Sequence, residues 1–547
     1  MDITLGFIEY YLLIQILSSI ALFPYFKAMG IEPWKALVPF LKTWIVLDKT
    51  ERSKWQMILV YIPVVNHVMA IIMAYELLHG FNKRKWSDIL LTVFTLGLYM
   101  GYMGFTNKKL NWVGKNEVQM KAQLGDWIPS IFFAVVAATT IRAFSFEAYT
   151  IPTPSMEKSL MVGDYLFVSK AHYGVRMPMT PVAIPLMHAT IPFTQLPSFT
   201  TKVQLPYFRL PAFQEVQRNQ SFVFNYPGEV ENPIDKKQNY VKRCVAVAGD
   251  TLSVVNGMVH INGEEQTWPD RANSQFSYYV RTNADNALNP RTLKDKFDIN
   301  YINNEQQLRY QNSSDVIPIS TREYLITLSS DKVELFKTIP NVVEVHRVNT
   351  PKPGQPIEGD YPSMYKRYTQ SINNNAVFPD NTVSGHNDTL TFNWSRDQYG
   401  PLYIPKKGVT VPLDYKAYLT YYRLITTYEG HTFERRGNEY LVDGEPANSY
   451  TFAQNYYWAM GDNRHNSSDS RYWGFVPETH IVGKPVFIWM SLDKFRGGFD
   501  KVRTDRVFTT VHGTGERVSY FWYVLALFVI NYLYKNFIKK KKASGKS

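Results

Sequence analysis

Long apolar runs lie towards both ends of the 547-residue chain, whereas its middle alternates between apolar and polar positions. The apolar runs cover residues 5–26, 57–78, 89–105, 127–141 and 518–538. A helix that crosses a bilayer needs about 20 mainly apolar residues. The first, second and last runs reach that length, and 127–141 reaches it if Arg142 extends its side chain to the interface. The pattern predicts several membrane helices before residue 146 and one after residue 517.

The middle of the chain has the pattern of strands and turns. Asn256-Gly257 separates two short alternating runs, and Asn-Gly is typical of a tight β-hairpin turn. Seven prolines between residues 177 and 213 exclude a helix there. That stretch is either an irregular connector packed on the core or an apolar surface that dips into the membrane. The second interpretation depends on Phe193, Leu196, Phe199, Phe208 and Phe213.

The net charge of +12 is concentrated beside the apolar runs. Residues 1–126 hold 13 basic and 9 acidic residues, and the last fifteen residues hold six lysines and no acid. Because short basic loops stay in the cytoplasm, the loop 107–121 and the tail 539–547 should be cytoplasmic. Residues 146–517 should then lie outside the cytoplasm.

A basic cluster at 83–85 conflicts with the simplest topology, because it would face outwards if the second and third runs each crossed once. Pro63 and Asn66 lie in the middle of the second run, and they would allow it to form a re-entrant hairpin instead. Either arrangement leaves the large segment outside.

Composition excludes several kinds of site. Cys244 is the single cysteine, so neither an intrachain disulfide nor a cysteine-based zinc site or Fe–S cluster can form. We find no nucleotide or metal motif and predict no cofactor. The basic excess flanks apolar runs, so we predict no nucleic-acid-binding domain. Residues 1–25 lack a basic start and a clear small-residue cleavage site, so we expect no cleaved signal peptide.

A proline-rich string follows the fourth apolar run. Pro152 and Pro154 have a fixed φ and favour extended backbone in the residues before them. In an extended segment, Thr153 and Ser155 would face the same side, a few residues above the membrane. Alone, Thr-Pro-Ser is a common turn string, and most surface serines have no catalytic role.

A strand-like string at 240–250 carries a lysine among small apolar residues. Alternation would place Lys242 on one face with Cys244, Ala246 and Ala248. A lysine with an ordinary pKa of about 10.4 is protonated at neutral pH and cannot act as a base. Burial can lower that pKa by up to about 3–5 units, and a neutral amine can take a proton from a serine hydroxyl. For a lone lysine, the simpler interpretation is a side chain that reaches solvent from an edge strand.

A polar, turn-rich string covers residues 460–477 and ends in aromatic residues. It contains hydroxyls able to orient an amine, and an acid and a base able to pair. The simpler interpretation is a solvated loop. Trp473 and Phe475 argue against full solvation, because such large side chains pack against a core.

Together, the three strings resemble the characteristic boxes of bacterial type I signal peptidases, the membrane-bound serine/lysine endopeptidases of family S26. The matches cover a small share of the chain, and the final one holds almost letter for letter. The matched strings are a nucleophile box at 154–156, the turn at 163–164, a looser strand match at 220–224, a lysine box at 240–250 and the final box at 461–474.

The resemblance implies a role for each residue of the reaction centre. Ser155 is the expected nucleophile, and Lys242 is the general base that later protonates the leaving amine. The backbone N–H of Ser155 and the hydroxyl of Thr153 are the expected oxyanion hole, a feature often worth about 10²–10³ in rate per donor.

Supporting residues are implied in the same way. Ser467 is expected to hydrogen-bond the Lys242 amine and fix its direction. Asp469 is expected to be a structural support, paired with Arg471 or with Arg243. The sequence also departs from the family pattern: His465 stands where an aspartate is frequent, and a long stretch separates the lysine box from the final box.

The implied fold is a multi-pass membrane protein with α-helical membrane segments and a mainly β extracytoplasmic catalytic domain. That domain should have an antiparallel fold, similar to that of the signal peptidases and LexA, with a large inserted β or α+β region. The expected boundaries are 1–126 for an N-terminal membrane domain, 127–145 for an outward helix, 146–264 and 441–517 for the catalytic domain, 265–440 for the non-catalytic insert, 518–538 for a C-terminal helix and 539–547 for a basic tail.

The implied activity is the removal of N-terminal signal peptides from exported preproteins, through an acyl-enzyme and after small residues. An extended substrate lying against an edge strand fits this specificity. The expected partners are preprotein signal peptides and membrane lipids, with the secretion translocon nearby. The expected location is the bacterial inner membrane, with the catalytic domain on the periplasmic side.

Two alternatives remain open at this point. A Ser/His/Asp hydrolase could use one of the histidines, such as His172 or His465. A non-enzymatic, membrane-anchored β-rich scaffold in export is a different class of protein. Such a scaffold would be expected to have lost Ser155 or Lys242, and the sequence retains both.

Overall fold

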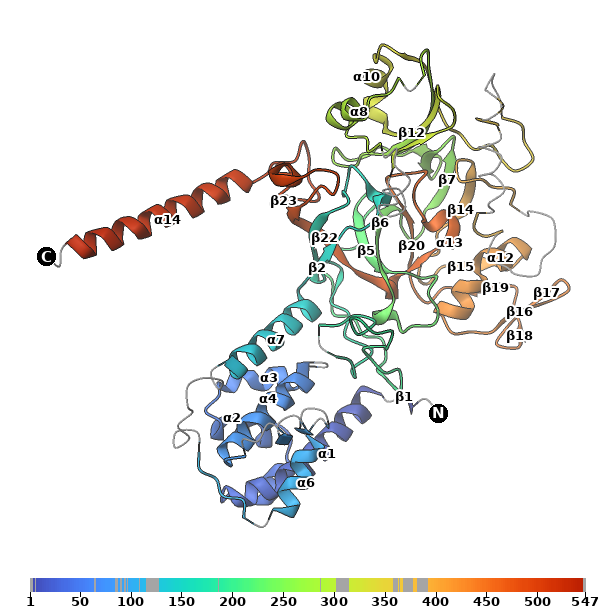
Figure 1. Ribbon diagram of the computed structural model, residues 1–547. Coiled ribbons are helices and arrows are strands. Elements are labelled where there is room, and N and C mark those ends of the chain that lie inside the picture. The colour runs from blue at the N-terminus through green and yellow to red at the C-terminus, as the bar shows by residue number, and fades with distance from the viewer. Residues whose placement is uncertain are drawn as a thin grey trace. The chain divides into compact units, whose positions relative to one another are not determined.

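The computed structural model describes two compact units, and each is presented by itself (Figure 1). A mainly helical unit contains residues 1–147, 174–212 and 230–237, and a β-rich unit contains the rest. The described residues are 3–4, 6–62, 65–83, 87–88, 91–92, 95, 97–107, 109–114, 127–184, 186–285, 287–301, 314–357, 363, 365–366, 377–380 and 392–544.

The helical unit is built from apolar helices that pack around aromatic side chains. Tyr25 and Phe26, near the end of the first helix, are fully buried. Glu9 lies in the first turn of that helix and Lys27 in its last turn, where each complements the partial charge of the helix end. The helices are α1 (Phe7–Ala28), α2 (Leu41–Lys49), α3 (Met57–Val60), α4 (Val65–Gly80), α6 (Leu98–Thr106) and α7 (Trp127–Phe144).

Among the described residues, one helical segment is long and apolar enough to cross a membrane. It is Tyr11–Ala28 of α1, with a mean hydropathy of 1.4. Apolar segments of α4 and α7 are shorter. The predicted run 57–78 is divided between α3 and α4, and the run 89–105 lies only partly within the described residues. Of the two basic segments used for the topology prediction, residues 108 and 115–121 of the loop and 545–547 of the tail also lie outside them.

The proline-rich stretch forms no α-helix in the part that the structure describes, 177–184 and 186–213. A short strand, β4 (Val203–Gln204), pairs in parallel with β1 (Ile3–Thr4). Of the five apolar side chains predicted to form a surface, Phe199 is partly buried and the other four are exposed. The exposure favours the apolar surface over a connector packed on the core.

A large antiparallel sheet forms the centre of the β-rich unit. Its strand order is β2-β3-β22-β5-β6-β20-β21, and β23 also pairs with β22. Apolar side chains such as Phe222, Phe224 and Trp458 are fully buried around it. The strands are β2 (Phe146–Thr150), β3 (Asp164–Ser169), β5 (Ser221–Asn225), β6 (Asn239–Ala246), β20 (Tyr456–Met460), β21 (Val476–Pro477), β22 (Ile481–Ser491) and β23 (Thr509–Thr510).

The predicted Asn-Gly hairpin is confirmed. Asn256 and Gly257 both have positive φ, 50° and 78°, and they join β7 (Thr251–Val255) to β8 (Met258–Ile261). A turn with two positive φ angles matches the twist of the strands on either side. Two further strands, β9 (Glu264–Glu265) and β14 (Tyr399–Tyr403), complete this sheet in the order β14-β7-β8-β9.

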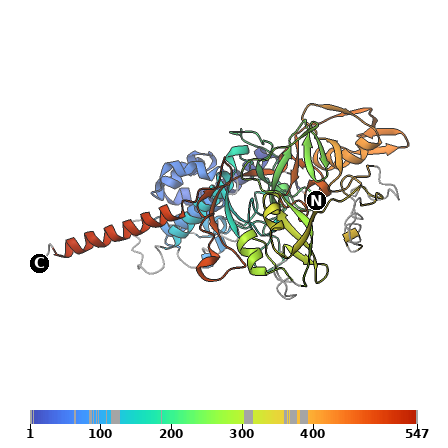
Figure 2. The same ribbon diagram turned by 90° about the horizontal axis from the view of Figure 1, so that it is seen from above.

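The region predicted as an insert, 265–440, contributes to two parts of the β-rich unit. Its first part forms a separate sheet in the order β11-β12-β10-β13, against which α8 and α10 pack through Leu293, Phe297 and Phe336 (Figures 1 and 2). The elements are β10 (Gln275–Thr282), α8 (Pro290–Phe297), β11 (Val316–Pro318), β12 (Glu323–Ser329), α10 (Val333–Lys337) and β13 (Val342–Arg347).

The second part of that region shares a core with the central sheet. Tyr399 on β14 and Tyr421 on α12 belong to the same buried cluster as Trp458 and Phe475. The remaining elements are α12 (Tyr415–Arg423), β15 (Thr410–Pro412), which pairs with β19 (Ser449–Thr451), and the small sheet β16 (Phe433–Arg436), β17 (Glu439–Val442) and β18 (Glu445–Pro446).

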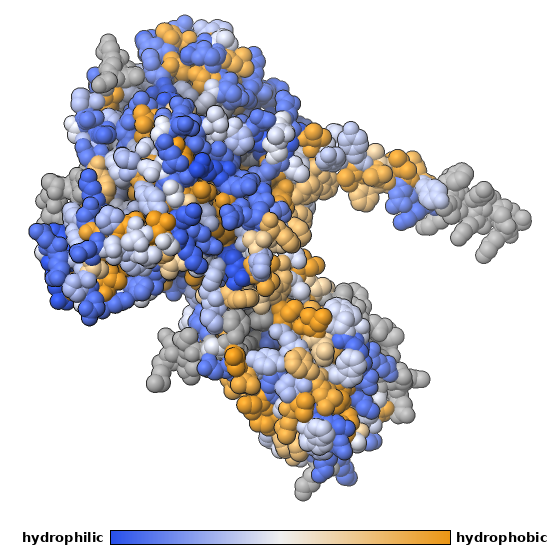
Figure 3. Space-filling model, turned by 180° about the vertical axis from the view of Figure 1, so that it is seen from behind, coloured by the Kyte–Doolittle hydropathy of each residue, from blue (hydrophilic) through white to orange (hydrophobic). Residues whose placement is uncertain are grey.

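The last helix, α14 (Phe521–Ser544), leaves the sheets of its own unit in both ribbon views (Figures 1 and 2). Large apolar side chains along it are exposed, among them Trp522, Phe528 and Leu533. The space-filling view shows hydrophobic residues along this projecting helix (Figure 3). An apolar surface of this length on a helix is a feature of interaction with a partner or a membrane.

Candidate active site

A short helical turn presents Ser155. Pro154–Met156 forms one turn of 3-10 helix, with a proline at its start, where the missing N–H is not needed. Thr153 precedes it in an extended conformation, with φ −124° and ψ 152°. The prediction that one extended strand carries both hydroxyls is therefore wrong: only Thr153 is extended, and Ser155 lies in the turn. Ser155 is buried, whereas Thr153 is exposed.

Strand β6 brings Lys242 to this turn. Phe222 on β5 is opposite Lys242, so the lysine sits inside the central sheet and not on a free edge. Its Nζ lies 2.6 Å from the Ser155 Oγ, although 87 residues separate the two in the chain. The Tyr240 ring lies beside the amine, with the Nζ 5.5 Å from the ring centroid. The structure thus brings together the two residues that the sequence suggested as a dyad.

Burial changes the protonation of Lys242. Its side chain is only 5% exposed, and the loss of hydration lowers the pKa of the amine to about 8. The carboxylates of Asp469 and Asp462 act in the opposite direction and raise the pKa, but burial is the larger effect. About a tenth of the amine is then neutral at pH 7, whereas an ordinary lysine would have less than about a thousandth. A base is therefore available beside the serine.

The final box holds the Ser155 turn in place. The backbone N–H of Asn463 donates to the Ser155 carbonyl at 3.1 Å, and its side-chain amide donates to the Pro154 carbonyl at 3.2 Å. Gly461 lies so close that an added Cβ would be 2.5 Å from the Ser155 carbonyl oxygen. A glycine is needed there because any side chain would displace the turn.

A buried ion pair organises the final box itself. Asp469 binds Arg471 through two contacts, of 2.9 Å to its Nε and 2.8 Å to its Nη2, and both side chains are fully buried. Asp469 also accepts the backbone N–H of Gly461 at 3.0 Å. The sequence left Arg471 and Arg243 as alternative partners, and the structure places Asp469 with Arg471.

Arg243 belongs to a second buried pair that the sequence analysis missed. Its Nε donates to Asp462 at 2.7 Å, and its other nitrogens reach the Asn219 carbonyl and the Ser159 hydroxyl. Neighbouring side chains on a strand point to opposite faces, so Arg243 and Lys242 lie on opposite sides of β6. Alternation along β6 was a usable signal that Arg243 and Lys242 face opposite sides. It could not identify Asp462 as the partner of Arg243, because that residue lies 219 positions away in the chain.

Ser467 does not contact the Lys242 amine as the sequence analysis expected. Its Oγ is buried and has no hydrogen-bond partner within the described part of the chain. The hydroxyl lies against Gly461, close to the Ser155 carbonyl, since an added Cβ on that glycine would meet both. Ser467 is thus near the Ser155 turn.

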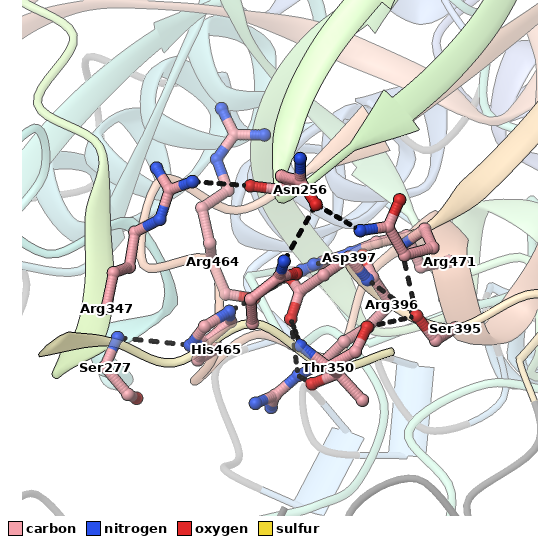
Figure 4. A network of polar contacts seen from close by, with 12 residues as sticks. Asn256, Ser277, Arg347, Thr350, Ser395, Arg396, Asp397, Arg464, His465 and Arg471 are labelled. Carbon is pink, nitrogen blue, oxygen red and sulfur yellow. Dashed lines mark hydrogen bonds and ion pairs between the residues drawn. The ribbon is translucent and has the colours of Figure 1, made fainter. Parts of the chain in front are cut away.

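The two histidines of the rival hydrolase hypothesis are engaged elsewhere. His465 lies between two partners: its Nδ1 accepts the backbone N–H of Ser277 at 3.1 Å, and its Nε2 is 3.0 Å from Asp397 (Figure 4). His172 lies 2.7 Å from the Ser169 hydroxyl. Because both His465 nitrogens are occupied, this ring cannot take the Ser155 proton.

His465 connects the final box to the region 265–440. Asp397 also accepts the backbone N–H of Thr350 at 2.8 Å, and the His465 side chain is nearly inaccessible (Figure 4). Despite burial, which alone would raise it, the interactions with His465, the charge of Arg396 and the Thr350 N–H hold the pKa of Asp397 well below its usual range. Asp397 was not predictable from the sequence, in which the only signal was a histidine at a position where an acid is frequent.

We expect His465→Asn to lower stability more than activity. The shorter side chain leaves the buried Asp397 oxygen without its partner, which should cost about 1–3 kcal/mol of the free energy of unfolding. Cleavage per folded molecule should stay within a few-fold of wild type. Urea unfolding and cleavage assays on the same preparation check this, and loss of all activity from a fully folded variant would instead support a histidine base.

Comparisons with known proteins give the following matches. The model of the family "Signal peptidase, peptidase S26" matches residues 124–325 and 382–490. A family of unknown function (DUF5684) matches residues 34–115. The Signal peptidase I of Buchnera aphidicola subsp. Schizaphis graminum is 26% identical over 375 residues, which cover 68% of this chain and 75% of the relative.

Two further relatives cover similar shares. The Signal peptidase I of Haemophilus influenzae is 24% identical over 420 residues, covering 74% of this chain and 81% of the relative. The Signal peptidase I of Aquifex aeolicus is 22% identical over 365 residues, covering 66% of this chain and 83% of the relative. The similarity therefore extends over the β-rich region and well beyond the short boxes.

Proposed function

The chain belongs to the signal peptidase family, peptidase S26, and we propose that it removes signal peptides with Ser155 as the nucleophile and Lys242 as the general base. It is a membrane-bound serine endopeptidase that acts on preproteins. The observation that carries the assignment of the dyad is the 2.6 Å contact between a buried amine and a buried hydroxyl.

The proposed reaction has two halves. Ser155 Oγ attacks the carbonyl carbon of the scissile bond while the neutral Lys242 amine takes its proton. The resulting ammonium gives that proton to the leaving amine, and the signal peptide stays bound to Ser155 as an ester. A water molecule, activated by the same amine, then hydrolyses the ester and restores both groups. The lowered pKa of Lys242 supports this cycle, because the amine can then both accept and release a proton near neutral pH.

Thr153 is the proposed side-chain donor of the oxyanion hole. Its hydroxyl is exposed, beside the turn that carries Ser155, and no hydrogen bond to it is found within the described residues. We expect Thr153→Val, which removes the donor at nearly constant shape, to lower kcat by about 10²-fold with little change in KM. Steady-state kinetics check this, with Thr153→Ser as the control that keeps the hydroxyl; equal rates for both variants would contradict it.

We propose that substrates are cut after small residues. A preprotein with alanine at the position before the cut should be processed, and one with tryptophan there should be cut at least about tenfold more slowly, because a shallow pocket excludes the larger side chain. Mass spectrometry of the product termini identifies the bond that is cut. Equal rates with both preproteins, or cleavage elsewhere, would contradict the proposal.

We propose that α1 and α14 both cross the inner membrane, with the β-rich unit on the periplasmic side and near the translocon. The exposed apolar side chains of α14 and its basic end support this arrangement. Cys244 is the only cysteine and is buried, which makes cysteine labelling specific.

Labelling tests the orientation directly. In spheroplasts, a membrane-impermeant maleimide should label Thr514→Cys, on the exposed segment before α14, without permeabilisation. It should label Lys546→Cys, in the basic tail, only after permeabilisation. Labelling of both positions from outside would contradict the crossing of α14.

A further inference from the structure

A cationic cavity lies on the other side of β6 from the dyad. It has a volume of about 370 Å³, and its lining contains Arg218, Arg243, Arg271, Arg517 and His512. Of the described residues that line it, none is acidic. Pockets of about 300–1,000 Å³ are the size range of ligand sites. The cavity is thus large enough for a small anionic group and has the complementary charge.

Two of the four arginines are neutralised and two are not. Arg218 binds Asp250 through two contacts of 2.6 and 2.8 Å, and Arg243 binds Asp462. Arg271 donates hydrogen bonds only to uncharged oxygens. They are the backbone carbonyls of Thr510, His512, Gly515 and Glu516 and the hydroxyl of Thr510. Among the described residues, no carboxylate lines the cavity or binds Arg271 or Arg517 directly, although Asp270 lies next to Arg271 and accepts the backbone N–H of Gly515.

Of these arginines, Arg517 has the fewest hydrogen bonds to the described residues. Its Nη2 donates to the Ser159 carbonyl at 2.6 Å, and its buried Nε has no partner within the described residues. Burial and the neighbouring arginines lower its pKa to about 9. Burial and nearby cations likewise lower the pKa of His512 to about 3, so this ring is neutral. Asp164 acts in the opposite direction on Arg517, but it already pairs with Arg506. Partial burial of a guanidinium without a carboxylate of its own is costly, and an anion in the cavity would lower that cost.

The cavity adjoins the start of the proposed membrane helix. Arg517 precedes the first residue of α14, Phe521, by four positions. The Ser519 hydroxyl fixes this connection: its single proton is within hydrogen-bonding reach of the carbonyls of Thr504 and Val507, at 2.5 and 2.7 Å. Trp522 and Tyr523 follow, both exposed, and such aromatic side chains favour the level of the lipid headgroups. If α14 crosses the membrane, the cavity opens at headgroup level.

We propose that the cavity binds the phosphate group of an anionic membrane lipid, with Arg517 and Arg271 as its charge partners. A guanidinium offers paired N–H donors that match phosphate oxygens. Arg517 and Arg271 both line the cavity, and the hydrogen bonds of Arg271 hold the segment 510–516 that forms part of its wall. This inference rests on the proposed crossing of α14.

The test uses the full chain, purified in detergent micelles and titrated by calorimetry with short-chain phosphatidylglycerol and with phosphatidylcholine of the same chain length. We expect phosphatidylglycerol to bind at least about tenfold more tightly. Arg517→Gln should remove about that tenfold preference, which corresponds to about 1.4 kcal/mol. Arg517→Lys, which keeps the charge, should retain most of it. Thermal unfolding verifies that each variant is folded.

Matched controls separate the site from general charge effects. Arg291→Gln removes an equal charge from an arginine that is 92% exposed on α8, and it should bind phosphatidylglycerol as wild type does. Ser155→Ala should also bind normally, so failure of the proposed reaction and failure of this site give different results. Equal binding of both lipids, or full binding by Arg517→Gln, overturns the proposal.

A third arm distinguishes the source of the phosphate. Inorganic phosphate should compete with phosphatidylglycerol only weakly, because it lacks the membrane-anchored part of the lipid. If inorganic phosphate binds in an Arg517-dependent manner while phosphatidylglycerol shows no preference over phosphatidylcholine, the lipid assignment is overturned.

Discussion

Replacing Lys242 by arginine is expected to lower the rate of preprotein cleavage by about 10⁴-fold. The guanidinium keeps the positive charge but stays protonated at every accessible pH, so it cannot take the Ser155 proton. The amine that does so in the wild type lies 2.6 Å from the hydroxyl and has a pKa of about 8. Cleavage of a purified preprotein in detergent, followed by gel or mass spectrometry, measures the loss.

The control is the same lysine-to-arginine exchange at a residue with no role in the proposed reaction. Lys407 is exposed, and Lys407→Arg should cleave at the wild-type rate. Ser155→Ala should be as inactive as Lys242→Arg, because one mechanism needs both groups. A folded Lys242→Arg variant that keeps more than a tenth of the wild-type rate would show that another group accepts the proton.

Asp469→Asn is expected to lower the free energy of unfolding by about 3–5 kcal/mol. The substitution removes the charge that balances Arg471, and it leaves a fully buried guanidinium unpaired. Cleavage should fall as well, because Asp469 holds the Gly461 backbone that packs against the Ser155 turn. Urea unfolding, followed by tryptophan fluorescence, measures the change in stability.

A surface aspartate provides the comparison. Asp295 pairs with Arg496 at 3.2 Å, and both side chains are largely exposed. Asp295→Asn should change stability by no more than about 1 kcal/mol, since exposed ion pairs contribute little. Similar losses for the two variants would contradict the role of the buried pair in organising the final box.

The sequence predicts the dyad better than the geometry around it. Lys242 and Ser155 are recognisable because three separate strings together resemble the boxes of the signal peptidases. Neither residue indicates a dyad by itself, since a lone lysine on a strand is more simply interpreted as one that reaches solvent. The turn at 154–156 was not predictable from the prolines, which are compatible with either extended backbone or the start of a helical turn. The Asn256-Gly257 hairpin was predictable because a local rule determines it.

Contacts between distant parts of the chain could not be read from the sequence. The pairing of Arg243 with Asp462, and of His465 with Asp397, depends on the packing of whole strands. Strand β14 lies in one sheet with β7 and β8, although a long stretch of chain that forms a sheet of its own separates β8 from β14. Through this placement Tyr399, on β14, shares a core with Trp458. The rule that successive side chains of β6 point to opposite faces also fails beyond Cys244, because the pairing register between β6 and β20 shifts there.

The pH dependence of kcat/KM decides whether a buried, neutral amine accepts the Ser155 proton. The folded-state pKa of Lys242 is lowered, so the neutral, active form accumulates as the pH rises through about 8. We expect a rate that increases with pH and levels off above that value, with no activity in Ser155→Ala at any pH. A rate that levels off near pH 6.5, as for a histidine base, or that still climbs towards pH 10, as for an exposed lysine, would contradict it.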